Sequence, residues 1–156
     1  MSVRRKETRY KKMTKQINFD MDGTIANLYG VKDWLPKLMA NDPTPYAIAD
    51  PLVNLQALAH RLNNLQRKGY AICVISWLSK TTTPEYDEKV IKAKREWLRV
   101  HLHSVKFDEI NIVAYGTPKQ TIGKGILFDD EAHNRNEWGE GAYTEKEIFE
   151  VLDRLI

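Results

Sequence analysis

The sequence predicts an α/β protein built on a doubly wound parallel sheet with helices on both faces. Short apolar runs alternate along the chain with segments in which apolar residues recur every three or four positions. Residues 70–75 (YAICVI) form a continuous apolar run, as in parallel strands that are buried on both faces. Polar residues directly follow several of these runs, as at the carboxyl edge of such a sheet, where ligands bind.

The first half of the chain is predicted to contain a strand, two helices and a loop. Residues 16–20 form a short buried strand, and residues 32–40 form a short helix that a proline interrupts. Three prolines in residues 41–51 predict a loop. Leucines at three- and four-residue spacing after Leu52 predict an amphipathic helix. It ends at Gly69, because glycine adopts the left-handed conformation at the lowest cost.

The second half of the chain repeats the alternation of strands and helices. A loop from Ser76 leads to a helix over residues 86–102, which is followed by strands over 110–114 and 125–128 and by a closing helix over 145–155. The residues predicted to point inward from the two helices are Val90, Ala93, Trp97 and Val100, and Ile148, Val151, Leu152 and Leu155.

Length and composition favour one soluble domain in a reducing compartment. The 156 residues suffice for a single core, and 42% hydrophobic with 29% charged residues is an ordinary soluble composition. No apolar run approaches the roughly 18 residues of a membrane span, and no apolar segment of a secretory signal follows the basic N-terminus. The only cysteine, Cys73, excludes an internal disulfide and lies in an apolar run, so we expect a cytoplasmic protein.

The net charge of +3 conceals a basic N-terminal arm, which we assign to residues 1–15, ahead of the folded domain at 16–156. Residues 1–16 hold seven Lys or Arg and one acid, which leaves 17 basic and 20 acidic residues in the remainder. The arm could contact the phosphates of nucleic acid or another anionic partner. The simpler interpretation, which we favour, is a partly disordered, solubilising leader.

Acidic residues gather where the predicted strands end. Asp20 and Asp22 alternate after the first strand, Ser76 follows the second, and Asp129 and Asp130 follow the fourth. Clustered carboxylates repel one another, and a hard divalent ion such as Mg²⁺ relieves that repulsion. A hydroxyl and a nearby lysine would donate hydrogen bonds to phosphate oxygens. The pattern therefore predicts magnesium-dependent phosphoryl transfer with a carboxylate nucleophile.

These motifs resemble those of the haloacid dehalogenase (HAD) superfamily of phosphohydrolases. The resemblance consists of DMDGT after an apolar strand, a strand that ends in serine, an intervening lysine, and DD after a further strand. It spans about residues 16–130. Within the superfamily the motifs are most similar to those of the deoxyribonucleotide 5′-nucleotidases, so the resemblance implies a HAD-like fold and phosphatase activity.

The resemblance also implies roles for the acidic residues. Asp20 would attack phosphorus and form an aspartyl-phosphate, and Asp22 would act as general acid and then as general base. Mg²⁺ would be held by Asp20, by the backbone carbonyl of Asp22, and by a carboxylate of the Asp129–Asp130 pair.

Further residues are implied to bind the transferred phosphoryl group. Ser76 and the backbone N–H of Trp77 would donate to it, and Thr24 would lie beside it and hold Asp22 through its hydroxyl. Lys119, ten residues before Asp129, would be the lysine of the third motif. The alternatives for that lysine are Lys124, Lys80 and Lys94.

Residues 26–50 occupy a position where the superfamily inserts a cap, and they would form only a minimal one. A site this open would admit a large substrate unless a second subunit covered it. Aromatic residues near its mouth could stack on a base, or Trp34 and Tyr46 could instead pack the insertion onto the core. The aromatic candidates are Tyr29, Trp34, Tyr46 and Trp77, and the polar candidates are Asn27, His133 and Asn134.

Histidines are interpreted as structural. His101 and His103 complement the dipole at a helix C-terminus more readily than they form a metal pair. His60 is expected to be exposed, and Trp97 to lie in the core.

The sequence as a whole indicates a Mg²⁺-dependent phosphomonoester hydrolase that acts on a nucleotide or on a nucleic-acid terminal phosphate. Two alternatives remain open. The pocket could bind or sequester a phosphorylated signalling nucleotide without turnover, or the chain could be a scaffold recruited by its basic arm. The presence of both Asp20 and Asp22 favours the hydrolase, because a binding protein needs no acid–base pair.

Overall fold

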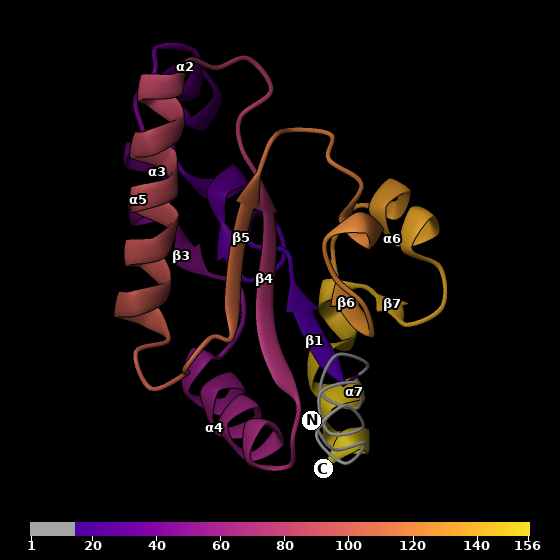
Figure 1. Ribbon diagram of the computed structural model, residues 1–156. Helices are drawn as coiled ribbons and strands as arrows, with labels where there is room; N and C mark the ends of the chain where they lie inside the picture. Colours follow the sequence, from indigo (N-terminus) through magenta and orange to yellow (C-terminus); the bar gives the residue numbers. More distant parts are fainter. Residues whose placement is uncertain (1–14) are drawn as a thin grey trace, which may run out of the picture.

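The computed structural model describes residues 15–156 and contains a five-stranded sheet in the order β5-β4-β1-β6-β7 (Figure 1). All four strand pairs in this sheet are parallel, which confirms the predicted fold class. The strands are β1 (Gln16–Phe19), β4 (Ala71–Trp77), β5 (Glu109–Val113), β6 (Ile126–Phe128) and β7 (Ala142–Tyr143). Most of the predicted basic arm lies outside the described residues.

The order of the strands places a switch in chain direction at the centre of the sheet. From β1 the chain moves outward through β4 to β5, and it then returns to the other side of β1 to form β6 and β7. The connections that leave β1 and β6 therefore run in opposite directions. Ligands bind beyond the carboxyl ends of two such neighbouring strands.

The main core lies between one face of the sheet and helices α4 (Leu55–Arg67), α5 (Pro84–His101) and α7 (Ile148–Leu155). Leucines of α4 at the predicted spacing are fully buried against Ile17 and Phe19 of β1. These leucines are Leu58, Leu62 and Leu65. The helix ends as predicted, with Gly69 at a φ of +100°.

The 26–50 insertion is more ordered than the predicted loop over residues 41–51. It contains β2 (Ala26–Asn27), the 3₁₀ turn η1 (Leu28–Gly30), α2 (Trp34–Met39) and α3 (Thr44–Ile48), and β2 pairs with β3 (Asp50–Pro51). The loop prediction was wrong because Pro45 occupies the first turn of α3, where a missing N–H costs nothing. Packing of Pro45 and Tyr46 beside α5 then stabilises the short helix.

Helix α5 begins two residues earlier than predicted, because the Thr83 side chain accepts a hydrogen bond from the N–H of Tyr86 at 3.2 Å. Val90 and Trp97 are buried as predicted. The prediction for Val100 was wrong, since its side chain is 53% exposed. It falls outside the buried stripe of the helix, which includes a lysine, Lys94.

Further differences lie in the chain after β5. Helix α6 (Ala132–Trp138) and the edge strand β7 were not predicted. The closing helix begins at Ile148, because residues 145–147 form the 3₁₀ turn η3 with a capping box between Thr144 and Glu147. Another 3₁₀ turn, η2 (Lys119–Thr121), precedes β6.

Three predictions of burial are confirmed by the structure. Trp97 and Cys73 are each 1% exposed, and His60 lies on the solvent side of α4. Within residues 15–156, no helix combines the length and the apolar character that crossing a membrane requires.

Candidate active site

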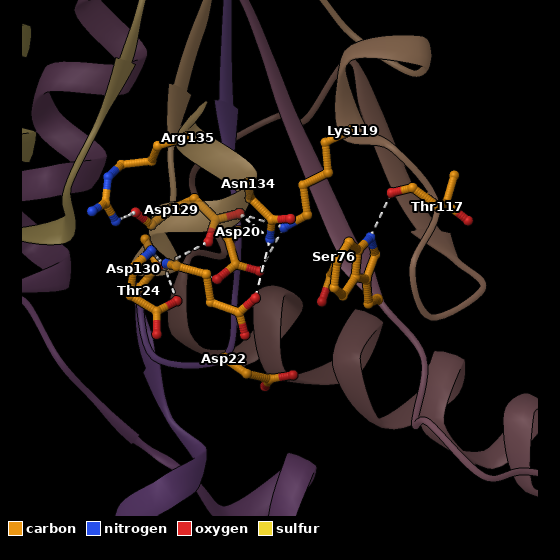
Figure 2. Close-up of polar contacts among 12 residues, drawn as sticks. Asp20, Asp22, Thr24, Ser76, Thr117, Lys119, Asp129, Asp130, Asn134 and Arg135 are labelled. Atoms are coloured by element: carbon orange, nitrogen blue, oxygen red, sulfur yellow. Dashed lines mark hydrogen bonds and ion pairs between the residues drawn. The ribbon is translucent and has the colours of Figure 1, made fainter. Parts of the chain in front are cut away.

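Asp20 and Asp129 leave neighbouring strands at the carboxyl edge of the sheet (Figure 2). Asp20 directly follows β1, and its N–H donates to the carbonyl of Phe128 at 3.0 Å. Asp129 directly follows β6, and its N–H donates to the carbonyl of Tyr143 at 3.0 Å. The sheet thus holds both backbones in place and directs both residues to the switch in chain direction.

Three carboxylates form what we call the acid cluster: Asp20, Asp129 and Asp130. Each offers an oxygen within 4.8 Å of the others. The Nζ of Lys119 donates to Oδ1 of Asp20 at 2.9 Å and to Oδ2 of Asp129 at 2.7 Å, and this side chain is only 2% exposed. Three carboxylates against one ammonium leave a formal charge of −2 in a buried place.

The pKa shifts reflect this excess of negative charge. Burial raises the pKa of Asp130 to about 8, and the neighbouring Asp20 adds to the shift. Burial also raises the pKa of Asp129 to about 6, with Asp20 adding to the effect and Lys119 opposing it. Burial disfavours the charge of Lys119, but Asp20 and Asp129 outweigh it, so the pKa of Lys119 is raised. An additional cation would favour the ionised carboxylates.

The turn DMDGT shapes the site between Asp20 and Asp130. The carbonyl of Met21 accepts from the N–H groups of Thr24, Ile25 and Ala26, which turns the chain back on itself. Gly23 has a φ of +84°, and a Cβ at this position would collide with the Asp130 carboxylate. Only glycine satisfies both conditions.

Thr24 joins members of the acid cluster. Its Oγ1 donates to Oδ2 of Asp20 at 2.9 Å and accepts from the N–H of Asp130 at 3.1 Å. The side chain is fully buried. The expectation that its hydroxyl holds Asp22 is therefore corrected: it orients Asp20, because the tight turn places it over the end of β1.

Asp22 points away from the acid cluster, as Figure 2 shows. Its Oδ2 accepts from the Nζ of Lys94 at 2.9 Å. Burial raises the pKa of Asp22, although Lys94 opposes the shift, and Asp20 adds to it. The carboxylate stays 17% exposed and lines a cavity, so it can reach a bound molecule.

Ser76 and Trp77 end β4, and the hydroxyl of Ser76 makes a different contact from the one expected. Ser76 is fully buried, and its Oγ accepts from Lys94 at 2.7 Å rather than facing the cavity. The Trp77 ring does line the cavity, and its Nε1 donates to the carbonyl of Thr117 at 2.8 Å. The sequence analysis placed the Ser76 hydroxyl and the Trp77 backbone N–H beside the phosphoryl group. The sequence does not show that Lys94 contacts Ser76.

The other lysines considered for the third motif do not bridge Asp20 and Asp129, although Lys80 lines the cavity. Lys124 and Lys80 are exposed, and Lys94 approaches Asp22 rather than the acid cluster. Lys119 is the lysine that the structure brings to Asp20 and Asp129.

Residues after the DD pair hold Asp129 in a fixed orientation. Asn134 Nδ2 donates to Oδ2 of Asp129 at 3.1 Å, and the N–H of Glu131 donates to Oδ1 at 3.0 Å. Arg135 donates to the backbone carbonyl of Asp129 at 3.0 Å. Sequence reasoning listed Asn134 as a candidate and missed Arg135. The polar residues that follow Asp129 and Asp130 in the sequence could have indicated both Asn134 and Arg135.

A cavity of about 700 Å³ lies over Asp20, Asp22 and Lys119. One wall comes from the 26–50 insertion and the other from the ends of β4 and β5. The wall from the insertion is largely apolar or aromatic, whereas the opposite wall also carries the polar residues 79–83. Several apolar or aromatic wall residues are half exposed or more: Tyr29 (47%), Leu35 (50%), Met39 (77%) and Tyr115 (52%). Trp77 and Tyr115 meet edge to face with their ring centroids 5.0 Å apart.

The aromatic residues of the insertion both pack and line the cavity. Tyr46 is 5% exposed, and it packs with Tyr86 and Val90 while its hydroxyl bonds Ser79 at 2.9 Å. Trp34 is partly buried in the same cluster and meets Tyr29 edge to face. Tyr46 therefore packs the insertion onto the core, which was one of the two alternatives. Tyr29 is half exposed and lines the cavity.

The remaining polar candidates lie away from the acid cluster. Asn27 caps η1 by accepting from the N–H of Gly30 at 3.0 Å. His133 is exposed, and its Nε2 lies 3.8 Å from a carboxylate oxygen of Glu137. His101 packs its ring on Trp97 at 4.5 Å. Among residues 15–156, the acid cluster is the one group of His, Cys, Asp and Glu side chains arranged to hold a metal ion.

Comparison with known proteins shows similarity in structure alone. No protein-family model matches the chain, and no curated protein matches its sequence. A chain in the structure of a Pnkp1/Rnl/Hen1 complex has a TM-score of 0.56 and 14% identity, over 85% of this chain. The match covers 46% of that chain, so the present protein spans less than half of its length.

A second similar structure is the D,D-heptose 1,7-bisphosphate phosphatase from Burkholderia thailandensis. It has a TM-score of 0.54 and 11% identity, and the match covers 90% of this chain and 97% of that one. At these identities, the two likenesses establish the fold and nothing finer.

Proposed function

We propose that this chain, which has a HAD-like fold, is a Mg²⁺-dependent phosphomonoester hydrolase. One observation carries the proposal: Asp20 of the acid cluster lines a cavity together with the buried Lys119 that bridges it to Asp129, and a further carboxylate, Asp22, lines the cavity apart from the cluster. A nucleophile and a separate acid–base group are the two parts that this hydrolysis needs.

The donor set fits Mg²⁺. All ligand atoms that the acid cluster offers are oxygens, and its formal charge of −2, with Lys119 included, matches a divalent ion. Asp20, one carboxylate of the Asp129–Asp130 pair and the backbone carbonyl of Asp22 would hold it. When bound, the ion would neutralise charge on the phosphoryl oxygens as a Lewis acid.

The residues of the chain would divide the reaction into two displacements. In the first, a carboxylate oxygen of Asp20 forms a bond to phosphorus while the bond to the leaving oxygen breaks, and protonated Asp22 gives that oxygen its proton. In the second, water attacks the phosphorus of the aspartyl-phosphate and passes a proton to Asp22. Inorganic phosphate leaves, and Asp20 is free again. Lys119 balances the charge of Asp20 throughout.

The similar structures support phosphatase chemistry. One of them is a phosphatase of a sugar bisphosphate, and its match covers nearly the whole of both chains. In the present chain, Asp20 and Asp129 lie at the carboxyl ends of two neighbouring strands of the shared fold.

A nucleotide is the substrate class that the cavity favours. Its walls carry Tyr29, Trp77 and Tyr115, whose faces could stack on a base at about 1–3 kcal/mol per base. A free nucleotide and a nucleic-acid end share this base and phosphate. The motifs favour the free (deoxy)nucleotide, and the basic arm favours the polynucleotide end.

Phosphate release from a panel of phosphomonoesters tests the proposal. The full chain with Mg²⁺ is expected to release phosphate, and Asp20→Asn to reduce the rate at least about 1,000-fold, because the nucleophile is lost. Glu88→Gln, which changes an exposed acid on α5, is the matched control and should leave the rate unchanged.

The same experiments distinguish a hydrolase from a binding protein, and they test the substrate class and the role of the arm. Intact ligand recovered bound to both the wild type and Asp20→Asn, without phosphate release, would identify a binding protein. Faster release from nucleotides than from sugar phosphates would support the substrate class. If removal of residues 1–15 left activity on oligonucleotide ends unchanged, the arm would have no part in recognition.

A further inference from the structure

Lys94 is a buried lysine that the proposed reaction leaves without a role. It lies in the middle of α5 and is 1% exposed. Its three N–H donors are all used: Oδ2 of Asp22 at 2.9 Å, Oγ of Ser76 at 2.7 Å and the carbonyl of Trp77 at 2.7 Å. The ring of Tyr46, from the 26–50 insertion, also faces the ammonium, with its centroid 4.9 Å from Nζ.

We infer that Lys94 is a positioning residue, which holds the carboxylate of Asp22 beside the cavity and away from the acid cluster. The inference rests on the proposed function, because it assigns a support to the general acid–base group. Ser76 acts in this arrangement as an acceptor that anchors Lys94.

Geometry makes Lys94 a rigid anchor. Its backbone belongs to an 18-residue helix, and two of its acceptors belong to the end of β4. Asp22 forms an isolated bridge with Ala26, just before the turn at residues 23–25. The lysine therefore ties the free end of the Asp22 side chain to a helix and a strand. A catalytic group must be held within a fraction of an ångström to act well.

Charge explains why the support must be a cation. Without Lys94, the carboxylate of Asp22 would face two other attractions: Lys119 and the divalent ion that the acid cluster is suited to hold. Turning toward either would remove it from the leaving oxygen. Stability alone is a poor explanation for Lys94, because a buried ion pair is often no better than a well-packed apolar pair.

Variants of Lys94 and Asp22 should change kcat/KM in the same way on two kinds of substrate. An alkyl phosphate needs a proton on its leaving oxygen, and an activated aryl phosphate does not. Lys94→Met is expected to lower kcat/KM at least about 100-fold for the alkyl phosphate and less than about tenfold for the aryl phosphate. Asp22→Asn is expected to show the same split. Inhibition by inorganic phosphate should change less than about threefold, because the acid cluster and Lys119 are untouched.

The matched control is Lys92→Met, which removes an exposed lysine from the same helix. It should match the wild type on both substrates. An equal loss on both substrates for Lys94→Met, or a large loss of phosphate inhibition, would overturn the inference. Either result would mean that Lys94 supports the fold or the phosphate site instead.

A double variant keeps the test decisive if Lys94→Met does not fold. Asp22→Asn with Lys94→Met removes both charges together and leaves no unpaired buried carboxylate. Its kcat/KM should equal that of Asp22→Asn alone within about threefold, because Lys94 acts through Asp22. A further tenfold loss would overturn the inference. If the wild type itself releases no phosphate, the proposed function fails first.

Discussion

Gly23 shows how one residue supports the acid cluster. Its φ of +84° is in the left-handed region, and the Asp130 carboxylate occupies the space where a Cβ would lie. The residue therefore serves two purposes: it lets the chain turn after Asp22, and it lets Asp130 approach the turn. A side chain at this position would strain the backbone and displace an acid.

Gly23→Ala is expected to lower the free energy of unfolding by about 1–3 kcal/mol and to reduce phosphatase activity. Gly69→Ala is the matched control. Gly69 has a φ of +100°, but no atom lies within 4 Å of the Cβ that would be added. It should lose stability from strain alone and keep full activity. Urea unfolding and phosphate release measure the two effects, and equal activity in both variants would contradict this reading of Gly23.

The sequence favoured Lys119 as a lysine of the site and offered Lys94 only as an alternative to it, without its contact to Asp22. Lys119 could be singled out because it precedes Asp129 by ten residues, a spacing similar to that in the phosphohydrolases that the motifs resemble. Lys94 carries no such mark. In the sequence it stands in a helix among other charged residues, and its burial depends on Asp22, which is 72 residues away in the chain.

At the scale of elements, helix α5 connects the insertion to the sheet. Its buried stripe contacts α3 of the insertion through Tyr86 and Val90. Its Trp97 donates a buried hydrogen bond from Nε1 to the carbonyl of Ala49 at 2.8 Å, at the end of the insertion. The same helix carries Lys94, so the packing of the insertion and the position of Asp22 depend on one element.

Trp97→Phe is expected to lower the free energy of unfolding by about 1–3 kcal/mol, because it leaves the buried carbonyl of Ala49 without its donor and removes ring volume. Val100→Ala changes an exposed residue of the same helix and should shift it by no more than about 0.5 kcal/mol. Denaturant unfolding monitored by circular dichroism compares the two. Similar losses in both would argue against a structural link through Trp97.

Elements were predicted where their own pattern was strong. The leucines of α4 and the apolar run of β4 are local signals, and both appear in the structure. Helix α3 has only five residues, one of them Pro45, so its sequence carried no helical period. Prolines and aspartates flank it on both sides, at Asp42, Pro43, Asp50 and Pro51. The contact with α5 forms it. The edge strand β7 has two residues and depends on β6 in the same way.

At the scale of the whole molecule, the order of the strands unites the site. Asp20 and Asp129 are more than 100 residues apart in the chain, and they meet because β1 and β6 are neighbours at the switch in chain direction. The excess of negative charge that results is a property of the folded state. In the unfolded chain, these acids are separate and solvated.

Mg²⁺ should therefore stabilise the folded protein. An ion that binds only the native state adds about 2.7 kcal/mol at a concentration of 100 times its Kd. For a domain of this size, the midpoint of thermal unfolding should rise by about 5–10 °C. Asp130→Asn should reduce the rise, while Glu88→Gln should keep it. A midpoint that does not respond to Mg²⁺ would contradict a metal site in the acid cluster.

The sequence by itself determined the parallel α/β class and the presence of acids at the ends of its strands. Both follow from local patterns: apolar runs of strand length, helical spacing, and polar residues at the point where each run stops. Only the tertiary structure decided how the side chains pair. Lys94 joins Asp22, Thr24 joins Asp20, and α3 folds against α5. Each of these pairings depends on the direction in which a side chain points once distant segments have packed, and no spacing in the chain records that direction.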